Sequence, residues 1–202
     1  LFNRTLLDLL NGKEVNLPEF NFRLGKKEYK GKTLKLGDDD IVIVEGLHAI
    51  NEKLTPAIEA KNKYKIYISP LTQLNIDNHN RIHTSDIRRL RRMVRDNNFR
   101  GYSASDTLNS WSSIRTGEEK YVFPFQDEAD IVINSSLLYE IGVLKLYAEP
   151  LLFSVKENED CYPEAIRLIN FLRNFLAIPS ENVPKDSVLR EFIGGSCYYE
   201  KK

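Results

Sequence analysis

The stretch Asp40-Ile41-Val42-Ile43-Val44-Glu45-Gly46 decides the fold class of this sequence. Its four consecutive β-branched residues show no polar alternation, which is typical of a strand buried on both faces of a parallel sheet. Glu45 stands at the carboxyl end of the predicted strand, which is the edge where ligands bind in open α/β sheets. The stretch therefore predicts a parallel sheet with a carboxylate at its ligand-binding edge.

Further strands and helices are expected on both sides of this stretch. Strands are predicted at residues 64–69 and 129–134, and helices at residues 1–10, 51–60, 84–98, 103–111, 114–120, 137–153, 163–176 and within 186–195. A β-hairpin flap is predicted over residues 18–36, around Gly25 and Gly31. Strands that alternate with helices indicate an α/β fold with a parallel sheet.

The bulk composition narrows the function classes. Lys plus Arg and Asp plus Glu both number 29, and this balance argues against a general polyanion-binding protein. Cys161 and Cys197 form no metal-binding pattern and no disulfide framework, so we expect two reduced thiols in a cytoplasmic protein. No run approaches the ~20 apolar residues of a membrane span. The oligomeric state stays open, and a homo-oligomer is compatible with the sequence.

Glu45 is a candidate metal ligand. Mg²⁺ keeps several waters and takes one or two carboxylates together with phosphate oxygens, so a single strand-end acid suits it. The alternative is a structural acid that caps a neighbouring helix or pairs with a lysine. Both interpretations are compatible with the local pattern.

Arginines cluster on the predicted helix 84–98. Arg88, Arg91, Arg92 and Arg95 flank its apolar stripe, and Arg100 follows beside a glycine. Phosphoryl transfer needs cations that neutralise charge on the phosphate oxygens, and the planar guanidinium binds phosphate bidentately. This predicts a lid that closes on a nucleotide. The alternatives are a solvated helix face that pairs with acids, and an RNA-binding surface, which the zero net charge disfavours.

The predicted flap carries an aromatic residue beside basic ones. Phe20 could stack on a nucleobase, with Lys26 and Lys27 nearby. The alternative is an ordinary edge hairpin whose lysines prevent edge-to-edge pairing.

Together, five segments resemble the uridine kinase and phosphoribulokinase family. In chain order they are Val15–Phe22, which resembles the entry to the nucleoside flap; Ile41–Gly46, the Glu-Gly strand; Arg91–Asp96, the Arg-Arg-x-x-Arg-Asp helix; Arg100-Gly101 in the lid; and Ala129–Ile133, the closing strand. The five motifs occur in register over about residues 1–135, which makes the resemblance fairly specific.

The resemblance implies ATP-dependent phosphoryl transfer to a nucleoside or a similar small hydroxyl acceptor. It implies that Glu45 helps to coordinate Mg²⁺, that Arg95 and Arg100 contact the ATP phosphates, and that Arg92 contacts the nucleoside. It also implies a P-loop-type core over residues 1–136, with lid helices at about 84–120. A helical extension follows over residues 137–202.

The sequence departs from the family pattern at the nucleoside-reading positions. Phe20 stands where the family has a stacking Tyr, Gly25 where it has a base-reading His, Tyr102 in place of an Arg, and Ser110 in place of a Gln. The residues that the resemblance assigns to phosphate and metal binding match the family pattern better than those that it assigns to the nucleoside. The acceptor is therefore not expected to be uridine in particular.

The phosphate-binding loop of the family is absent from the printed sequence. No Gly-x-x-x-x-Gly-Lys-Ser/Thr motif occurs, and the chain opens at Leu1 on a helical pattern. We therefore expect the carboxy-terminal part of a longer kinase, inactive by itself because the β- and γ-phosphates lack their backbone cradle. The alternative is a non-catalytic nucleotide-binding module on the same scaffold.

Overall fold

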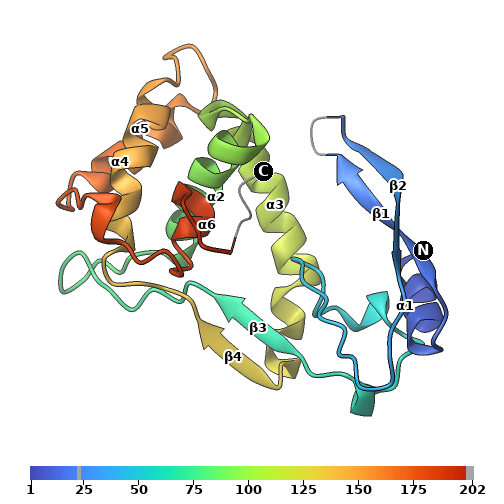
Figure 1. Cartoon of the computed structure of the whole chain (residues 1–202). Helices are drawn as coiled ribbons and strands as arrows, with labels where there is room; N and C mark the ends of the chain where they lie inside the picture. The colour runs from blue at the N-terminus through green and yellow to red at the C-terminus, as the bar shows by residue number, and fades with distance from the viewer. Residues whose placement is uncertain (22–23, 199–202) are drawn as a thin grey trace. The chain divides into compact units, whose positions relative to one another are not determined.

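The computed structural model describes residues 1–21 and 24–198, and it divides into two compact units (Figure 1). The first unit comprises Leu1–Tyr67 and Arg115–Val132, and the second comprises Ile68–Ile114 and Ile133–Lys202. Phe22 and Arg23 of the predicted flap lie outside the described residues. The α/β class is confirmed at this level, since both helices and small sheets are present.

The first unit contains the predicted hairpin. Helix α1 (Phe2–Leu10) buries Leu6 and Leu9, and β1 (Val15–Asn21) pairs antiparallel with β2 (Lys26–Leu34). The helix expected at residues 51–60 is wrong: the structure has the 3₁₀ turns η1 (Glu52–Leu54) and η2 (Ala60–Asn62). Pro56 explains the difference, because the residue before a proline is biased away from the α conformation.

The predicted strand at residues 40–46 is absent from the structure. Residues 41–45 have no assigned secondary structure, and Ile41 and Ile43 are 87% and 89% exposed. An interior strand depends on hydrogen bonds to neighbours on both sides. The two described sheets, β1 with β2 and β3 with β4, contain two strands each, so this segment has no strand partner among the described residues.

Strands β3 (Ile66–Ser69) and β4 (Ile131–Asn134) confirm the other two predicted strands. Backbone hydrogen bonds join Asp130 N to Lys65 O at one end and Ser135 N to Ser69 O at the other, which is a parallel register. Ile66 and Ile68 are exposed while the alternate residues of β3 are buried, as in a strand covered on one face only.

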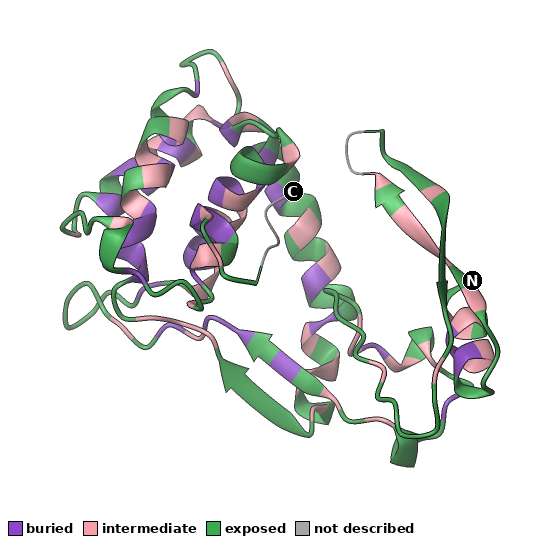
Figure 2. Ribbon diagram, in the orientation of Figure 1, coloured by how far each residue is buried: buried purple, intermediate pink, exposed green. Residues whose placement is uncertain are grey.

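The second unit holds the main hydrophobic core (Figure 2). Its helices are α2 (Thr84–Arg100), the first part of α3 (Ala104–Tyr121), α4 (Glu140–Phe153), α5 (Tyr162–Leu172) and α6 (Arg190–Ile193). Helix α4 packs against α2 and α5, and α6 packs against α2. Leu90, Leu144 and Leu168 are fully buried where these helices meet. Helix α3 is continuous where two helices were expected.

Two shorter 3₁₀ segments, η3 (Phe123–Glu128) and η4 (Ser180–Asn182), complete the fold. Within the described residues, no helix combines the length and the apolarity that crossing a membrane requires. The division into a core of residues 1–136 and an extension of 137–202 stays a prediction.

Gly142 on α4 provides a direct test of the packing. A Cβ atom at this position would lie 2.8 Å from Ile178 Cδ1 and 2.8 Å from the carbonyl oxygen of Leu176. Gly142→Ala is therefore expected to lower the free energy of unfolding by about 1–3 kcal/mol, the usual cost of overpacking. Urea unfolding followed by circular dichroism measures this change. Gly117→Ala, where a Cβ meets no atom within 4 Å, should not destabilise the protein.

Candidate functional site

Helix α2 places the predicted arginines. Ile87, Leu90 and Met93 are fully buried, and this apolar stripe fixes which way the helix faces. The helix ends at Arg100, and Gly101 adopts a left-handed conformation with φ of 74°. This C-cap suits glycine, which has no Cβ to clash. The glycine cap therefore ends α2 directly after Arg100.

Three of the predicted site residues meet at one carboxylate, that of Asp96. Arg95 Nε donates to Asp96 Oδ1 at 2.9 Å, and Arg100 Nη1 donates to the same oxygen at 3.1 Å. Arg92 Nε lies 3.2 Å from Asp96 Oδ2 as an ion pair. The Asp96 side chain is only 3% exposed, whereas those of Arg92, Arg95 and Arg100 are 34%, 23% and 27% exposed.

This arginine cluster, defined as Arg92, Arg95 and Arg100 around Asp96, has the chemistry of an anion site. Three guanidinium groups and one carboxylate leave a formal charge of +2. Each of the three arginines contacts Asp96 through one or two of its guanidinium nitrogens. Guanidinium groups are the side chains that bind phosphate oxygens through charge-assisted hydrogen bonds, and the excess of positive charge suits an anion.

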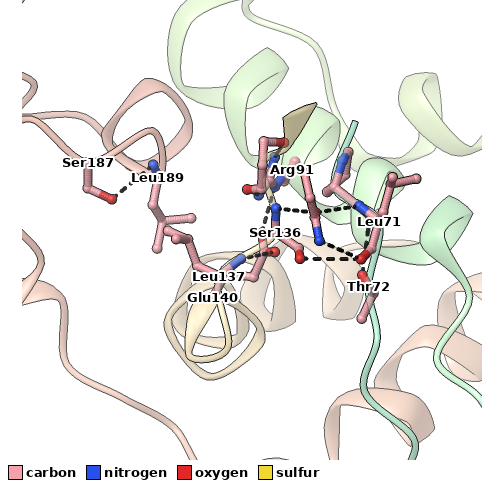
Figure 3. A network of polar contacts seen from close by, with 11 residues as sticks. Leu71, Thr72, Arg91, Ser136, Leu137, Glu140, Ser187 and Leu189 are labelled. Carbon is pink, nitrogen blue, oxygen red and sulfur yellow. Dashed lines mark hydrogen bonds and ion pairs between the residues drawn. The ribbon is translucent and has the colours of Figure 1, made fainter. Parts of the chain in front are cut away.

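Arg91 has a different role from its neighbours on α2. Its Nε donates to Glu140 Oε2 at 2.6 Å, its Nη2 donates to the carbonyl oxygen of Ser135 at 2.7 Å, and both charged side chains are buried (Figure 3). Glu140 Oε1 also accepts the backbone N–H of Leu137. This network ties α2 to the end of β4 and the start of α4, so Arg91 stabilises the fold.

Another ionic cluster links α2 to α5. Arg167 forms two hydrogen bonds with the buried Asp86, at 2.6 and 3.0 Å. Arg89 lies over the ring of Trp111 and pairs with Glu164, and burial lowers the pKa of its guanidinium to about 10. Arg89 stays protonated at neutral pH, so both pairs hold α5 on α2. Arg88 is half-buried on the same helix.

Glu45 lies in the first unit and the arginine cluster in the second. Its carboxylate is exposed, and among the described residues it makes no hydrogen bond or ion pair. No set of three His, Cys, Asp or Glu side chains within residues 1–21 and 24–198 could hold a metal ion. Glu45 therefore fits Mg²⁺ only as a single ligand beside phosphate oxygens and water. Its metal role stays a prediction.

Phe20 lies on β1 opposite Lys27 of β2 and is 56% exposed. The Lys27 ammonium lies 5.2 Å from the centre of the Tyr29 ring, on the same face of the hairpin. The flap thus presents aromatic rings and an ammonium group together. This arrangement suits a planar ligand, and the stacking role of Phe20 stays a prediction.

A small cavity of about 170 Å³ opens at the carboxyl ends of β3 and β4. Its polar lining comes from Thr72, Gln73, Asn134, Ser136 and Glu140, and the Asn134 amide holds the backbone of the loop after β3. The cavity is smaller than the several hundred Å³ of an ordinary ligand pocket. The sequence gives no sign of this cavity, because its lining joins two loops about 60 residues apart and nothing local marks either loop.

Asp96 was likewise missed as a site residue. Asp96 closes the Arg-Arg-x-x-Arg-Asp motif, in which the arginines are the residues with an expected phosphate or nucleoside contact. The spacing carried part of the signal, since Arg92 at i−4 and Arg100 at i+4 are neighbours of Asp96 on a helix surface.

Comparison with known proteins shows where this chain has relatives. The model of the phosphoribulokinase / uridine kinase family matches residues 1–140. Uridine kinases of Staphylococcus aureus strains JH9 and Newman are 28% identical over 134 residues, which cover 66% of this chain and 56% of theirs. The chain therefore spans just over half the length of these curated relatives. No solved structure matches it.

Proposed function

Because this chain belongs to the phosphoribulokinase / uridine kinase family, we propose that it is part of an ATP-dependent kinase that phosphorylates a nucleoside or a similar small hydroxyl acceptor. The observation that carries the proposal is the arginine cluster around Asp96. It groups three cations at the end of the helix that matches the family's lid motif. We also propose a cytoplasmic location, in keeping with the free Cys161 and Cys197.

The arginine cluster would act on the nucleotide. Arg95 and Arg100 would donate hydrogen bonds to phosphate oxygens and neutralise charge as the phosphoryl group moves. Arg92 would orient the acceptor, and Phe20 would stack on its planar part. The net charge of +2 on the cluster supports binding of a polyanionic ligand.

Glu45 would hold Mg²⁺, which supplies charge neutralisation between the phosphates when bound. This role requires residues 41–45 to form a strand. The exposed Ile41 and Ile43 support such a transition, because apolar β-branched side chains in water gain free energy on burial, about 25 cal/mol per Å². We infer that further strands in a longer protein pair with this segment.

Kinase assays on two forms of the protein test the proposal. The first form is the chain of residues 1–202, and the second is the proposed longer protein, which contains this chain together with a P-loop segment. With Mg-ATP and a panel of nucleosides and small polyols, the longer protein should phosphorylate at least one acceptor. The chain alone should not, because it lacks a P-loop motif. Robust turnover by the chain alone, or a longer protein that binds no nucleotide, would contradict the proposal.

The second candidate function is a non-catalytic nucleotide-binding module. The departures at Phe20 and Gly25 favour it, because they weaken acceptor recognition and leave the phosphate residues in place. Tight Mg-ATP binding by the longer protein, without product from any acceptor, would identify the module. RNA binding is less favoured, since Arg91 is buried against Glu140 and cannot contact a backbone phosphate.

A further inference from the structure

Helix α6 packs against the second half of α2 (Figure 1). Asn98 Nδ2 donates to the carbonyl oxygen of Phe192 at 3.0 Å. The Arg91 guanidinium lies 5.1 Å from the centre of the Phe192 ring, and this phenylalanine is buried. A Cβ atom on Gly194 would lie 3.8 Å from Phe99 Cζ, so these two residues are also neighbours. The contacts with α6 and its C-cap therefore extend from Arg91 to the last turn of α2.

Helix α6 has only four residues and needs support from its flanks, because isolated short helices are not stable in water. Arg190 supplies part of this support, since its Nη2 donates to the carbonyl oxygen of Val183 at 2.6 Å. After α6, the backbone N–H of Cys197 donates to the carbonyl oxygen of Lys185 at 2.9 Å. These bonds close residues 183–197 into one unit, which is called the α6 segment.

We propose that the α6 segment fixes α2 in place, so that Arg95 reaches the nucleotide from a stationary helix instead of from a lid that opens and closes. The inference rests on the proposed function, in which Arg95 contacts a phosphate oxygen. Phe192 is the positioning residue, because the two α2 residues that it contacts, Arg91 and Asn98, stand about one turn before and one turn after Arg95. Phe192 itself is buried and acts only through α2.

The contacts of α2 are those of a core element. Ligand-binding lids belong to the least stable parts of proteins, which have few buried apolar contacts. In α2, by contrast, Leu90 and Met93 are fully buried. Arg91 joins two supports of the helix, since it pairs with Glu140 of α4 and faces the ring of Phe192. A lid motion of α2 would break this buried ion pair and expose the ring to water, and both changes are unfavourable.

The alternative role for the α6 segment is a general contribution to stability. Phe171 of α5 is the matched control, because it belongs to the same core and is 8% exposed, against 7% for Phe192. The Phe171 ring packs against Phe175, with the ring centres 5.1 Å apart. Replacement of Phe171 should destabilise the unit to a similar degree, but it leaves the contacts of Arg91 and Asn98 with Phe192 in place.

Amide hydrogen exchange of the full chain is the first test. Phe192→Ala should speed exchange at residues 95–100 of α2, relative to residues 144–152 of α4, by at least about tenfold, because removal of a buried phenyl ring is costly and the opening is local. Phe192→Leu should give a smaller change at the same place, and it keeps the test measurable if Phe192→Ala does not fold. Phe171→Leu should not speed exchange in α2 more than in α4.

Kinetics of the longer protein are the second test. Phe192→Leu should lower kcat by about ten- to a hundredfold, the scale of a small displacement of a group that contacts the reacting atoms. Phe171→Leu should leave kcat nearly unchanged when both variants are measured in the folded state, whereas a purely stabilising role would affect the two variants alike. Mg-ATP should not slow hydrogen exchange in α2 of the unmodified protein, because the helix is already fixed.

Several results would overturn the positioning role. They are an equal change of exchange in α2 and α4 for both Phe192 variants, an equal effect of Phe171→Leu, and an unchanged kcat in Phe192→Leu. Strong protection of α2 by Mg-ATP would also overturn it, because a closing lid gives that result. If the exchange results hold but the longer protein shows no kinase activity, the α6 segment still fixes α2 and the proposed function fails.

Discussion

Glu45→Gln in the longer protein should lower kcat by at least about a hundredfold, the scale seen when one preorganised electrostatic contact to the transition state is removed. The amide keeps the size of the side chain but removes the charge that Mg²⁺ needs as a ligand. Acceptor binding should change little, because no acceptor contact is assigned to Glu45. Steady-state kinetics at several Mg²⁺ concentrations measure both quantities, and higher Mg²⁺ should recover part of the activity.

Glu59→Gln is the control for Glu45. Glu59 is an exposed acid of the same unit whose partner is Lys61, so its replacement should leave kcat unchanged. Amide hydrogen exchange adds a structural check, since residues 41–45 should exchange more slowly in the longer protein than in the chain alone. Equal loss of turnover and acceptor binding in Glu45→Gln, or loss of neither, would argue against a metal role.

Glu140→Leu should lower the free energy of unfolding of the chain by about 3–5 kcal/mol, the usual cost of leaving one member of a buried ion pair alone. The substitution removes the partner of the buried Arg91 and the acceptor for Leu137 N–H. Urea unfolding monitored by circular dichroism gives the value. The loss should be visible without any ligand, because this network stabilises the fold.

Two further variants make the Glu140 result specific. Arg91→Met combined with Glu140→Leu should recover much of the loss, because replacing both members by apolar residues removes the unpaired charge. Arg115→Gln breaks an exposed pair with Glu119 and should cost no more than about 1 kcal/mol. A loss of under 1 kcal/mol in Glu140→Leu, similar to Arg115→Gln, would mean that the buried pair does not stabilise the fold as argued.

The helical part of the structure was predictable because its signals are local. The apolar stripe of α2 and the short final helix ending at Gly194 both appear as expected. The hairpin of β1 and β2 was also predictable, since its strands are close in sequence. The ion pair between Arg91 and Glu140 could not be predicted from the sequence, because nothing local distinguishes Arg91 from Arg92 one position later.

The sequence by itself determined the family, helix α2 and its set of arginines, because motif spacing and helical periodicity are encoded within a few turns of chain. Only the tertiary structure decided which arginines are buried, since Arg91 faces Glu140 while Arg95 faces Asp96. It also decided that residues 41–45 do not form a strand. A helix satisfies its backbone hydrogen bonds within its own segment, whereas a strand depends on neighbours, and the described residues give this segment none.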